Sequence, residues 1–130
     1  MARTREFDTT KVLNAVAAVF QKHGYEGSSI EKLVIASGLP RGSIYQAFGS
    51  KSGLFRETMK HVLQKLEDGS VRNLDPIIDL LIVAMWDRSK EDREVRAVIE
   101  VAIPLVEGIS SKNFNQLAWQ QIEKRSRIHL

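Results

Sequence analysis

The segment from residue 28 to residue 55, SSIEKLVIASGLPRGSIYQAFGSKSGLF, constrains the fold more than any other part of the sequence. Its apolar residues recur at helical spacing, and Gly38 and Gly49 interrupt that spacing. Pro40 follows the first interruption, and the first turn of a helix tolerates a residue without an N–H group. The pattern predicts two short helices joined by a tight turn, with another helix starting directly after them.

The whole chain reads as helix, so the predicted fold class is all-α. It has 130 residues, of which 43% are hydrophobic and 27% are charged, a balance typical of a globular protein. There is no cysteine, which excludes disulfides, a thiol nucleophile and cysteine-ligated metals. The polar N-terminus and the lack of a long apolar run predict a cytoplasmic location.

Seven helices are expected, with approximate ranges 9–22, 28–37, 40–48, 51–68, 75–86, 90–106 and 112–128. Ser28 and Glu31 form a capping-box pattern, which predicts Ser28 as the N-cap of the second helix. Asp75 is expected to cap the fifth helix. Pro104 is expected to kink the sixth helix near its end, and residues 108–111 are expected to form a loop.

Charge divides the chain into two unlike halves. Residues 1–65 contain ten Lys and Arg against five Asp and Glu, whereas residues 66–130 contain nine against eleven. The first half is therefore basic and the second mildly acidic. This asymmetry favours an N-terminal unit that binds a polyanion and a C-terminal unit with another role.

The third predicted helix carries side chains suited to nucleic acid. Ile44 and Phe48 lie four residues apart, so they share a face that can pack against other helices. Arg41 and Tyr45 lie on another face, and an arginine can bond guanine through two hydrogen bonds. The arrangement predicts a helix-turn-helix whose second helix reads the DNA major groove.

The expected DNA contacts combine cationic, amide and hydroxyl groups with close backbone approach and a helix N-terminus. The candidate DNA-binding residues are Ser28, Ser29, Arg41, Gly42, Ser43, Tyr45, Gln46 and Lys51. Alternatives stay open for three of them: Ser28 as a cap alone, Tyr45 as a core residue and Lys51 as a solvated lysine. Arg3 and Arg5 would extend the surface toward the DNA backbone or minor groove.

Residues 9–66 resemble the N-terminal DNA-binding domain of TetR-type transcriptional regulators. The resemblance rests on the strings GYEGSSIEKL (24–33), ASGLPRGSIYQAF (36–48) and SKSGLF (50–55). It implies a helix-turn-helix domain at 1–52, followed at 53–130 by a linking helix and a shortened helical domain for regulation and dimerisation. It also implies a ligand-responsive repressor that binds a near-palindromic operator as a homodimer, and not an enzyme. The alternative is a truncated regulator or interaction module that has lost stable operator binding and acts by heterodimerisation.

The sequence departs from the family pattern at three positions and in length. Val34 stands where a small residue is common, Ala47 replaces an aromatic residue or His, and Gly53 replaces a residue that favours helix more. Family members typically continue through two more C-terminal helices, which form the dimer interface. The chain is therefore either a fragment or a short member that dimerises through its remaining helices.

By the same resemblance, residues 70–130 are expected to hold a small ligand between helices. The pocket candidates are Met85, Trp86, Ile103, Phe114 and Trp119. The alternative is that they are core or dimer-contact residues, with Trp119 and Leu117 at a subunit contact. No metal or cofactor is expected, because His23, His61 and His129 lack ligand spacing and no catalytic motif is present.

Overall fold

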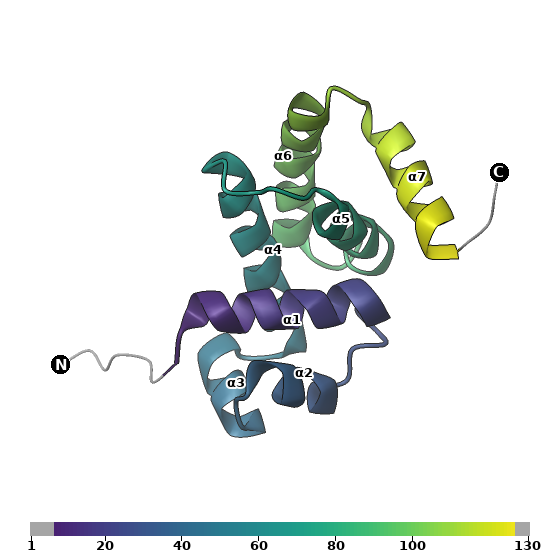
Figure 1. The fold of residues 1–130 in the computed structure, drawn as a ribbon. Coiled ribbons are helices and arrows are strands. Elements are labelled where there is room, and N and C mark those ends of the chain that lie inside the picture. The colour runs from purple at the N-terminus through teal and green to yellow at the C-terminus, as the bar shows by residue number, and fades with distance from the viewer. Residues whose placement is uncertain (1–6, 127–130) are drawn as a thin grey trace.

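A computed structural model describes residues 7–126, and over this range the chain folds entirely into helices and connecting turns (Figure 1). The elements are α1 (Thr9–His23), α2 (Ile30–Ser37), α3 (Arg41–Phe48), α4 (Lys51–Glu67), α5 (Asp75–Asp87), α6 (Arg93–Ser110) and α7 (Phe114–Ser126). The expected all-α class is confirmed. None of these helices combines the length and the apolar character that a bilayer span requires.

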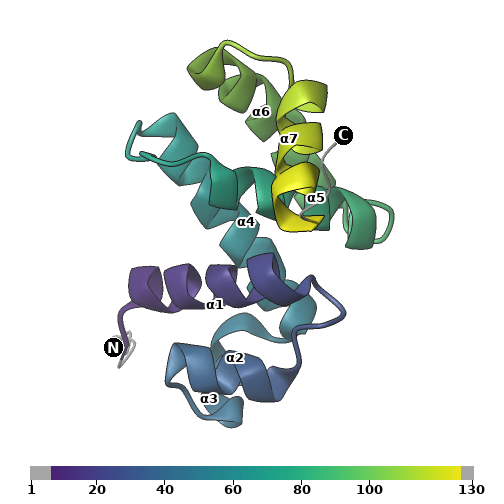
Figure 2. The same cartoon turned by 45° about the vertical axis from the view of Figure 1, so that its right-hand side comes forward.

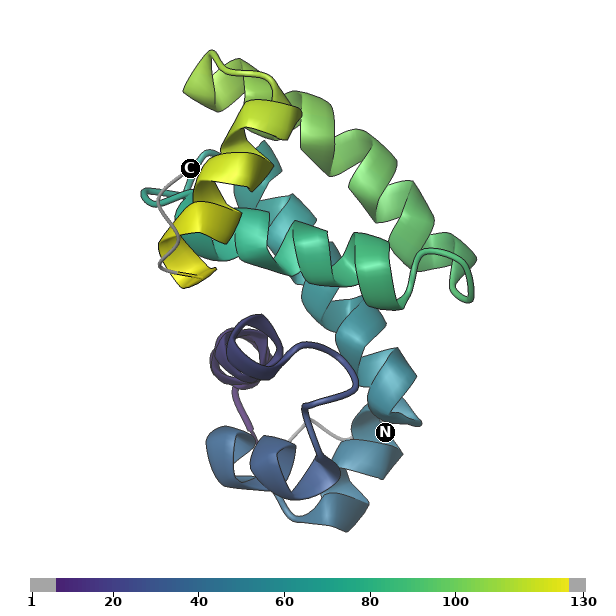
Figure 3. The same ribbon diagram turned by 90° about the vertical axis from the view of Figure 1, so that its right-hand side faces the viewer.

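The helices α1, α2 and α3 form a three-helix unit at one end of the molecule, and α5, α6 and α7 lie at the other (Figure 1). The long helix α4 runs from the first group into the second, where it packs along α6 (Figure 3). The helix α7 packs on α5 (Figure 2). Buried apolar side chains from all seven helices form one cluster, so the core is continuous between the two groups.

The helix ends in the first half follow from local sequence. Asp8 caps α1 by accepting a hydrogen bond from the backbone N–H of Lys11, and Ser50 caps α4 by accepting from Gly53. Gly38 ends α2 with φ 71° and ψ 10°, the left-handed conformation that glycine adopts without a steric penalty. The predicted starts of α1 and α4 and the predicted end of α2 are confirmed, and Gly38 makes the tight turn between α2 and α3.

The predicted cap of α2 was wrong by one residue. Ser29, not Ser28, is the N-cap, because the Ser29 hydroxyl accepts from the N–H of Lys32 at 3.2 Å. Ser28 is fully buried, and its hydroxyl donates to the carbonyl oxygen of Gly24 at 2.6 Å. With Ser29 as the N-cap, Glu31 is the second residue after the cap rather than the third, so the expected capping box between Ser28 and Glu31 does not form.

The second half departs further from the expected boundaries. The N-cap of α6 is Asp92, which accepts from the N–H groups of Glu94 and Val95, so the helix starts later than expected. It also continues through the predicted loop to Ser110, with Pro104 inside it. Asp75 is the first residue of α5 rather than its cap.

The C-terminal end of α5 contacts the three-helix unit. The Asp87 carboxylate accepts a hydrogen bond from the N–H of Tyr25 at 3.0 Å. The Arg88 guanidinium lies over the Tyr25 ring, 4.5 Å from its centroid, a distance at which a cation–π attraction acts. These contacts fix the position of the three-helix unit against the rest of the chain.

Candidate nucleic-acid interface

The short helix α3 has one anchored face and one open face. Ile44 is fully buried, and Phe48 is partly buried with its ring 6.4 Å from that of Phe7. The open face consists of Arg41, Gly42, Tyr45 and Gln46, which are exposed. Tyr45 is 43% exposed, so it is not a core residue. A helix held by apolar contacts and polar on its outer face has the form of a recognition helix.

Gly42 contributes open space at this face. A Cβ atom built on Gly42 would meet no other heavy atom within 4 Å, so the surface there is unobstructed.

Gly53, in the first turn of α4, is the opposite case. A Cβ there would lie 2.0 Å from the carbonyl oxygen of Phe48, so the turn from α3 to α4 leaves no room for it. This contact accounts for glycine at a position where helix propensity alone disfavours it.

Arg41 is paired with Glu31 across the turn between α2 and α3. The Arg41 Nη2 group donates to the Oε1 atom of Glu31, and the two side chains are 55% and 66% exposed. The pKa of Glu31 lies below its ordinary value, because its own backbone N–H and then the Arg41 guanidinium favour the ionised form. The sequence predicted Arg41 at this surface but not its partner.

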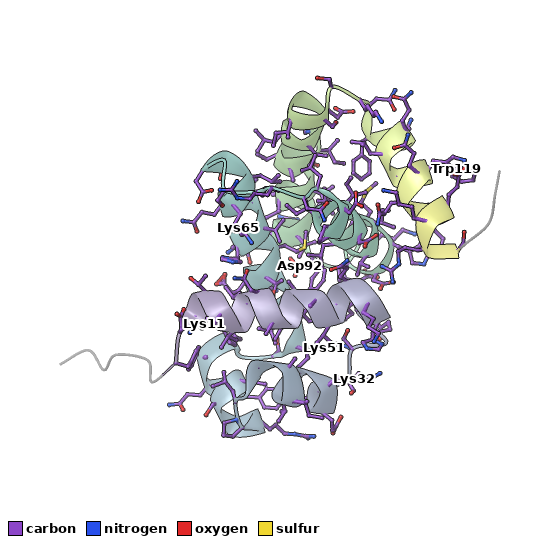
Figure 4. The ribbon with its side chains drawn as sticks, viewed as in Figure 1. Lys11, Lys32, Lys51, Lys65, Asp92 and Trp119 are labelled. Atoms are coloured by element: carbon purple, nitrogen blue, oxygen red, sulfur yellow. The ribbon has the colours of Figure 1, made fainter. Side chains whose placement is uncertain are left out.

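Lys51 and Ser29 lie at helix N-termini of the same unit. The Lys51 ammonium sits over the Tyr25 ring, 4.3 Å from its centroid, at the start of α4 (Figure 4). Ser29 is half-buried at the start of α2. Helix N-termini present backbone N–H groups and a positive dipole end, and a nearby lysine adds to their attraction for phosphate.

Ser28 does not belong to this surface, because its hydroxyl is buried and bonded to Gly24 and Val19. We therefore expect Ser28→Ala to lower the free energy of unfolding by about 1–3 kcal/mol, since a buried acceptor loses its donor. Urea denaturation followed by circular dichroism measures this change. Unchanged stability together with weaker DNA binding would instead support the phosphate contact expected from the sequence.

The structure places three of the five expected pocket residues at the surface. Phe114 is buried, whereas Met85, Trp86 and Trp119 are exposed at 42%, 88% and 56%. Trp119 projects from α7 away from the other helices (Figure 4). Three of the five candidates are therefore surface residues, and the ligand pocket expected from the sequence stays a prediction.

A hollow of about 480 Å³ lies elsewhere, between α1, α5 and α7. Its lining includes the apolar residues Ile82, Val83 and Ile122 and the polar residues Gln21, Asp79 and Arg125. Asp79 is buried, and its carboxylate accepts a hydrogen bond from Gln21 Nε2 at 2.9 Å and lies 3.5 Å from Arg125 Nη1. Sequence patterns do not reveal this site, because its three walls come from distant segments of the chain.

Some expectations concern residues outside the described range. Arg3 and Arg5, expected near the DNA backbone or minor groove, lie outside it, as does His129. Within residues 7–126, no three His, Asp or Glu side chains are grouped so that they could hold a metal ion.

Comparisons with known proteins agree with this geometry. The family described as "Bacterial regulatory proteins, tetR family" matches residues 12–58, which contain α2, α3 and most of α1. An uncharacterized HTH-type transcriptional regulator, YezE of Bacillus subtilis, is 41% identical over 64 residues, which cover 49% of this chain and 33% of YezE. The HTH-type transcriptional repressor ComR of Escherichia coli is 33% identical over 63 residues, or 48% of this chain and 30% of ComR.

A third relative, the HTH-type transcriptional repressor AcnR of Corynebacterium glutamicum, is 40% identical over 45 residues, or 35% of this chain and 24% of AcnR. The chain thus spans about a third or less of the length of these curated relatives. All three relatives are named as HTH-type transcriptional regulators or repressors. The buried and open faces of α3 agree with these matches, which show that the N-terminal part of the chain is similar to the TetR family over residues 12–58.

Proposed function

We propose that the chain is a transcriptional regulator that binds operator DNA through the open face of α3, and that it acts as a repressor. The observation that carries this proposal is the arrangement of α3, with Ile44 buried on one side and Arg41, Tyr45 and Gln46 exposed on the other. The proposed contact residues are Ser29, Arg41, Gly42, Ser43, Tyr45, Gln46 and Lys51. Two relatives that are named as repressors support the direction of regulation.

We further propose that residues 1–52 form the DNA-binding domain and that residues 53–130 serve linkage, ligand response and dimerisation. Two recognition helices one DNA turn apart would read a near-palindrome and gain affinity from being joined. The exposed apolar side chains of α5, α6 and α7 are suited to a subunit contact. They are Met85, Trp86, Val101, Ile109, Trp119 and Ile122.

Two variants test the proposed DNA surface. Arg41→Ala is expected to weaken operator binding by ~1–3 kcal/mol and to relax the preference at one base position, because the lost group reads a base edge. Lys51→Ala is expected to weaken binding on all sequences alike and to reduce the salt slope by about 1, because the lost group binds phosphate. Fluorescence anisotropy with operator and single-base variants at several salt concentrations measures both effects.

The wider proposal is tested by selecting bound sequences from a random DNA pool. An enriched near-palindrome with a steep salt dependence is the expected result. A pool without an enriched sequence would reject operator recognition, and a salt slope near zero would reject DNA binding altogether. A strictly monomeric mass in solution would favour the alternative, in which the chain acts by heterodimerisation.

A further inference from the structure

We infer that Glu31 is a positioning residue for DNA reading, which holds the Arg41 guanidinium toward the base edges and away from the phosphates. This inference rests on the proposed operator binding and deepens it, because it assigns sequence discrimination to a pair of residues rather than to Arg41 alone. The pair connects the second residue of α2 with the first residue of α3.

A contribution to folding does not explain this pair. Both side chains are more than half exposed, and exposed ion pairs contribute little to stability because water screens them. The partners also lie on the two helices that form the helix-turn-helix, and Arg41 belongs to the open face of α3. A carboxylate at such a surface repels the DNA phosphates, so Glu31 does not serve to raise the overall affinity for DNA.

The chemistry of the pair suits base reading. A guanidinium has five N–H donors, and the bond from Nη2 to Glu31 occupies one of them. The remaining donors still include an edge that can bond O6 and N7 of guanine together. Because Glu31 already restricts the Arg41 side chain in the free protein, less rotamer freedom is lost when the base contact forms.

Glu31 also disfavours the competing position of Arg41. A free arginine on this face would bind the nearest phosphate, which carries no sequence information. The Glu31 carboxylate attracts the guanidinium and repels the phosphate, so it favours the base contact over the phosphate contact. The low pKa of Glu31 keeps this carboxylate ionised at neutral pH.

The test is Glu31→Gln, which removes the charge and keeps the size of the side chain. We expect discrimination against a changed base at the position read by Arg41 to fall about tenfold. We also expect the slope of log K against log salt to steepen by about 0.9, as Arg41 becomes an additional phosphate contact. Thermal unfolding should match that of the parent, because the pair is exposed.

Two controls separate this effect from a general change of charge. Glu26→Gln removes an exposed carboxylate of the same domain, and it should leave discrimination unchanged. In an Arg41→Ala background, Glu31→Gln should have no further effect on discrimination, because the residue that it positions is absent. A tenfold loss in that background would show that Glu31 acts without Arg41 and would overturn the inference.

Two further outcomes separate the positioning role of Glu31 from operator binding itself. Suppose that the parent prefers its operator and that Glu31→Gln has the same base discrimination and the same salt slope. In that case the positioning role of Glu31 is wrong, and operator binding stands. If the parent itself shows no sequence preference, the proposed function fails, and the role of Glu31 fails with it.

Discussion

Phe55→Ala is expected to lower the free energy of unfolding by about 3–5 kcal/mol, since a fully buried aromatic side chain leaves a cavity behind. Phe55 lies on α4 with no exposed surface. Its ring meets those of Phe20 and Tyr25 edge-on, with centroids 4.9 Å and 5.3 Å away, a geometry that adds to the energy of burial. The three rings lie on α1, on the turn after α1 and on α4. Removal of the Phe55 ring therefore weakens the packing of α4 against α1.

Chemical denaturation gives this change directly, and Ile35→Ala is the control. Ile35 is also a large apolar residue but is 81% exposed, so its truncation is expected to change stability by less than about 0.5 kcal/mol. A Phe55→Ala variant as stable as the control would show that the aromatic cluster does not hold α4 against α1.

Asp92→Ala is expected to lower the free energy of unfolding by about 3 kcal/mol, because one side chain performs two tasks. Its carboxylate caps α6 and pairs with Arg56 of α4 at 3.1 Å. The Asp92 side chain is only 3% exposed, whereas Arg56 is 32% exposed and retains a second ion pair with Glu94. The substitution therefore removes a helix cap and one ion pair between α4 and α6, which lie together near the middle of the molecule (Figure 4).

The contribution of Asp92 to the free energy of unfolding should decrease as the pH falls. Burial alone would raise the pKa of Asp92, but hydrogen bonds from Arg56 and from the N–H groups of Val95 and Glu94 outweigh it and lower the pKa. A lowered pKa means that the contribution is fully present above the unfolded pKa of about 3.9 and is lost as pH falls through the folded value. The stability difference between parent and Asp92→Ala should therefore be constant near neutral pH and shrink on acidification below about pH 4.

Asp92→Asn separates the two tasks of this residue. Asparagine caps helices about as well as aspartate, so this variant should retain the cap, lose the ion pair and fall between parent and Asp92→Ala. Denaturation curves from pH 3 to pH 7 test the series. A difference that grows as the pH falls would contradict the assigned role.

Local sequence was sufficient to predict most of the helix boundaries in the first half of the chain. Asp8, Ser50 and Gly38 act on backbone groups within a few residues, so their effects on helix ends are visible without tertiary information. Ser28 was the exception. Two adjacent serines could each cap α2, and the choice depended on the burial of Ser28 against the carbonyl groups of Gly24 and Val19.

Local sequence was less informative in the second half. Pro104 and Gly108 suggested that α6 ends early, but the helix continues to Ser110 because packing decides where apolar segments end. The hollow beside Asp79 and the exposure of Trp86 were equally invisible, since both depend on which distant helices become neighbours.

The sequence by itself determined the helical class, the helix-turn-helix and the exposed residues of α3, because spacing and caps act over a few residues. Only the tertiary structure decided that Glu31 pairs with Arg41, that Asp92 joins α6 to α4, and that Gln21 of α1 bonds Asp79 of α5. The physical reason is that each of these facts is a distance between segments, which is set when the helices pack together. Segment 28–55 therefore specifies the two short helices and the turn between them, and packing supplies the partner of Arg41.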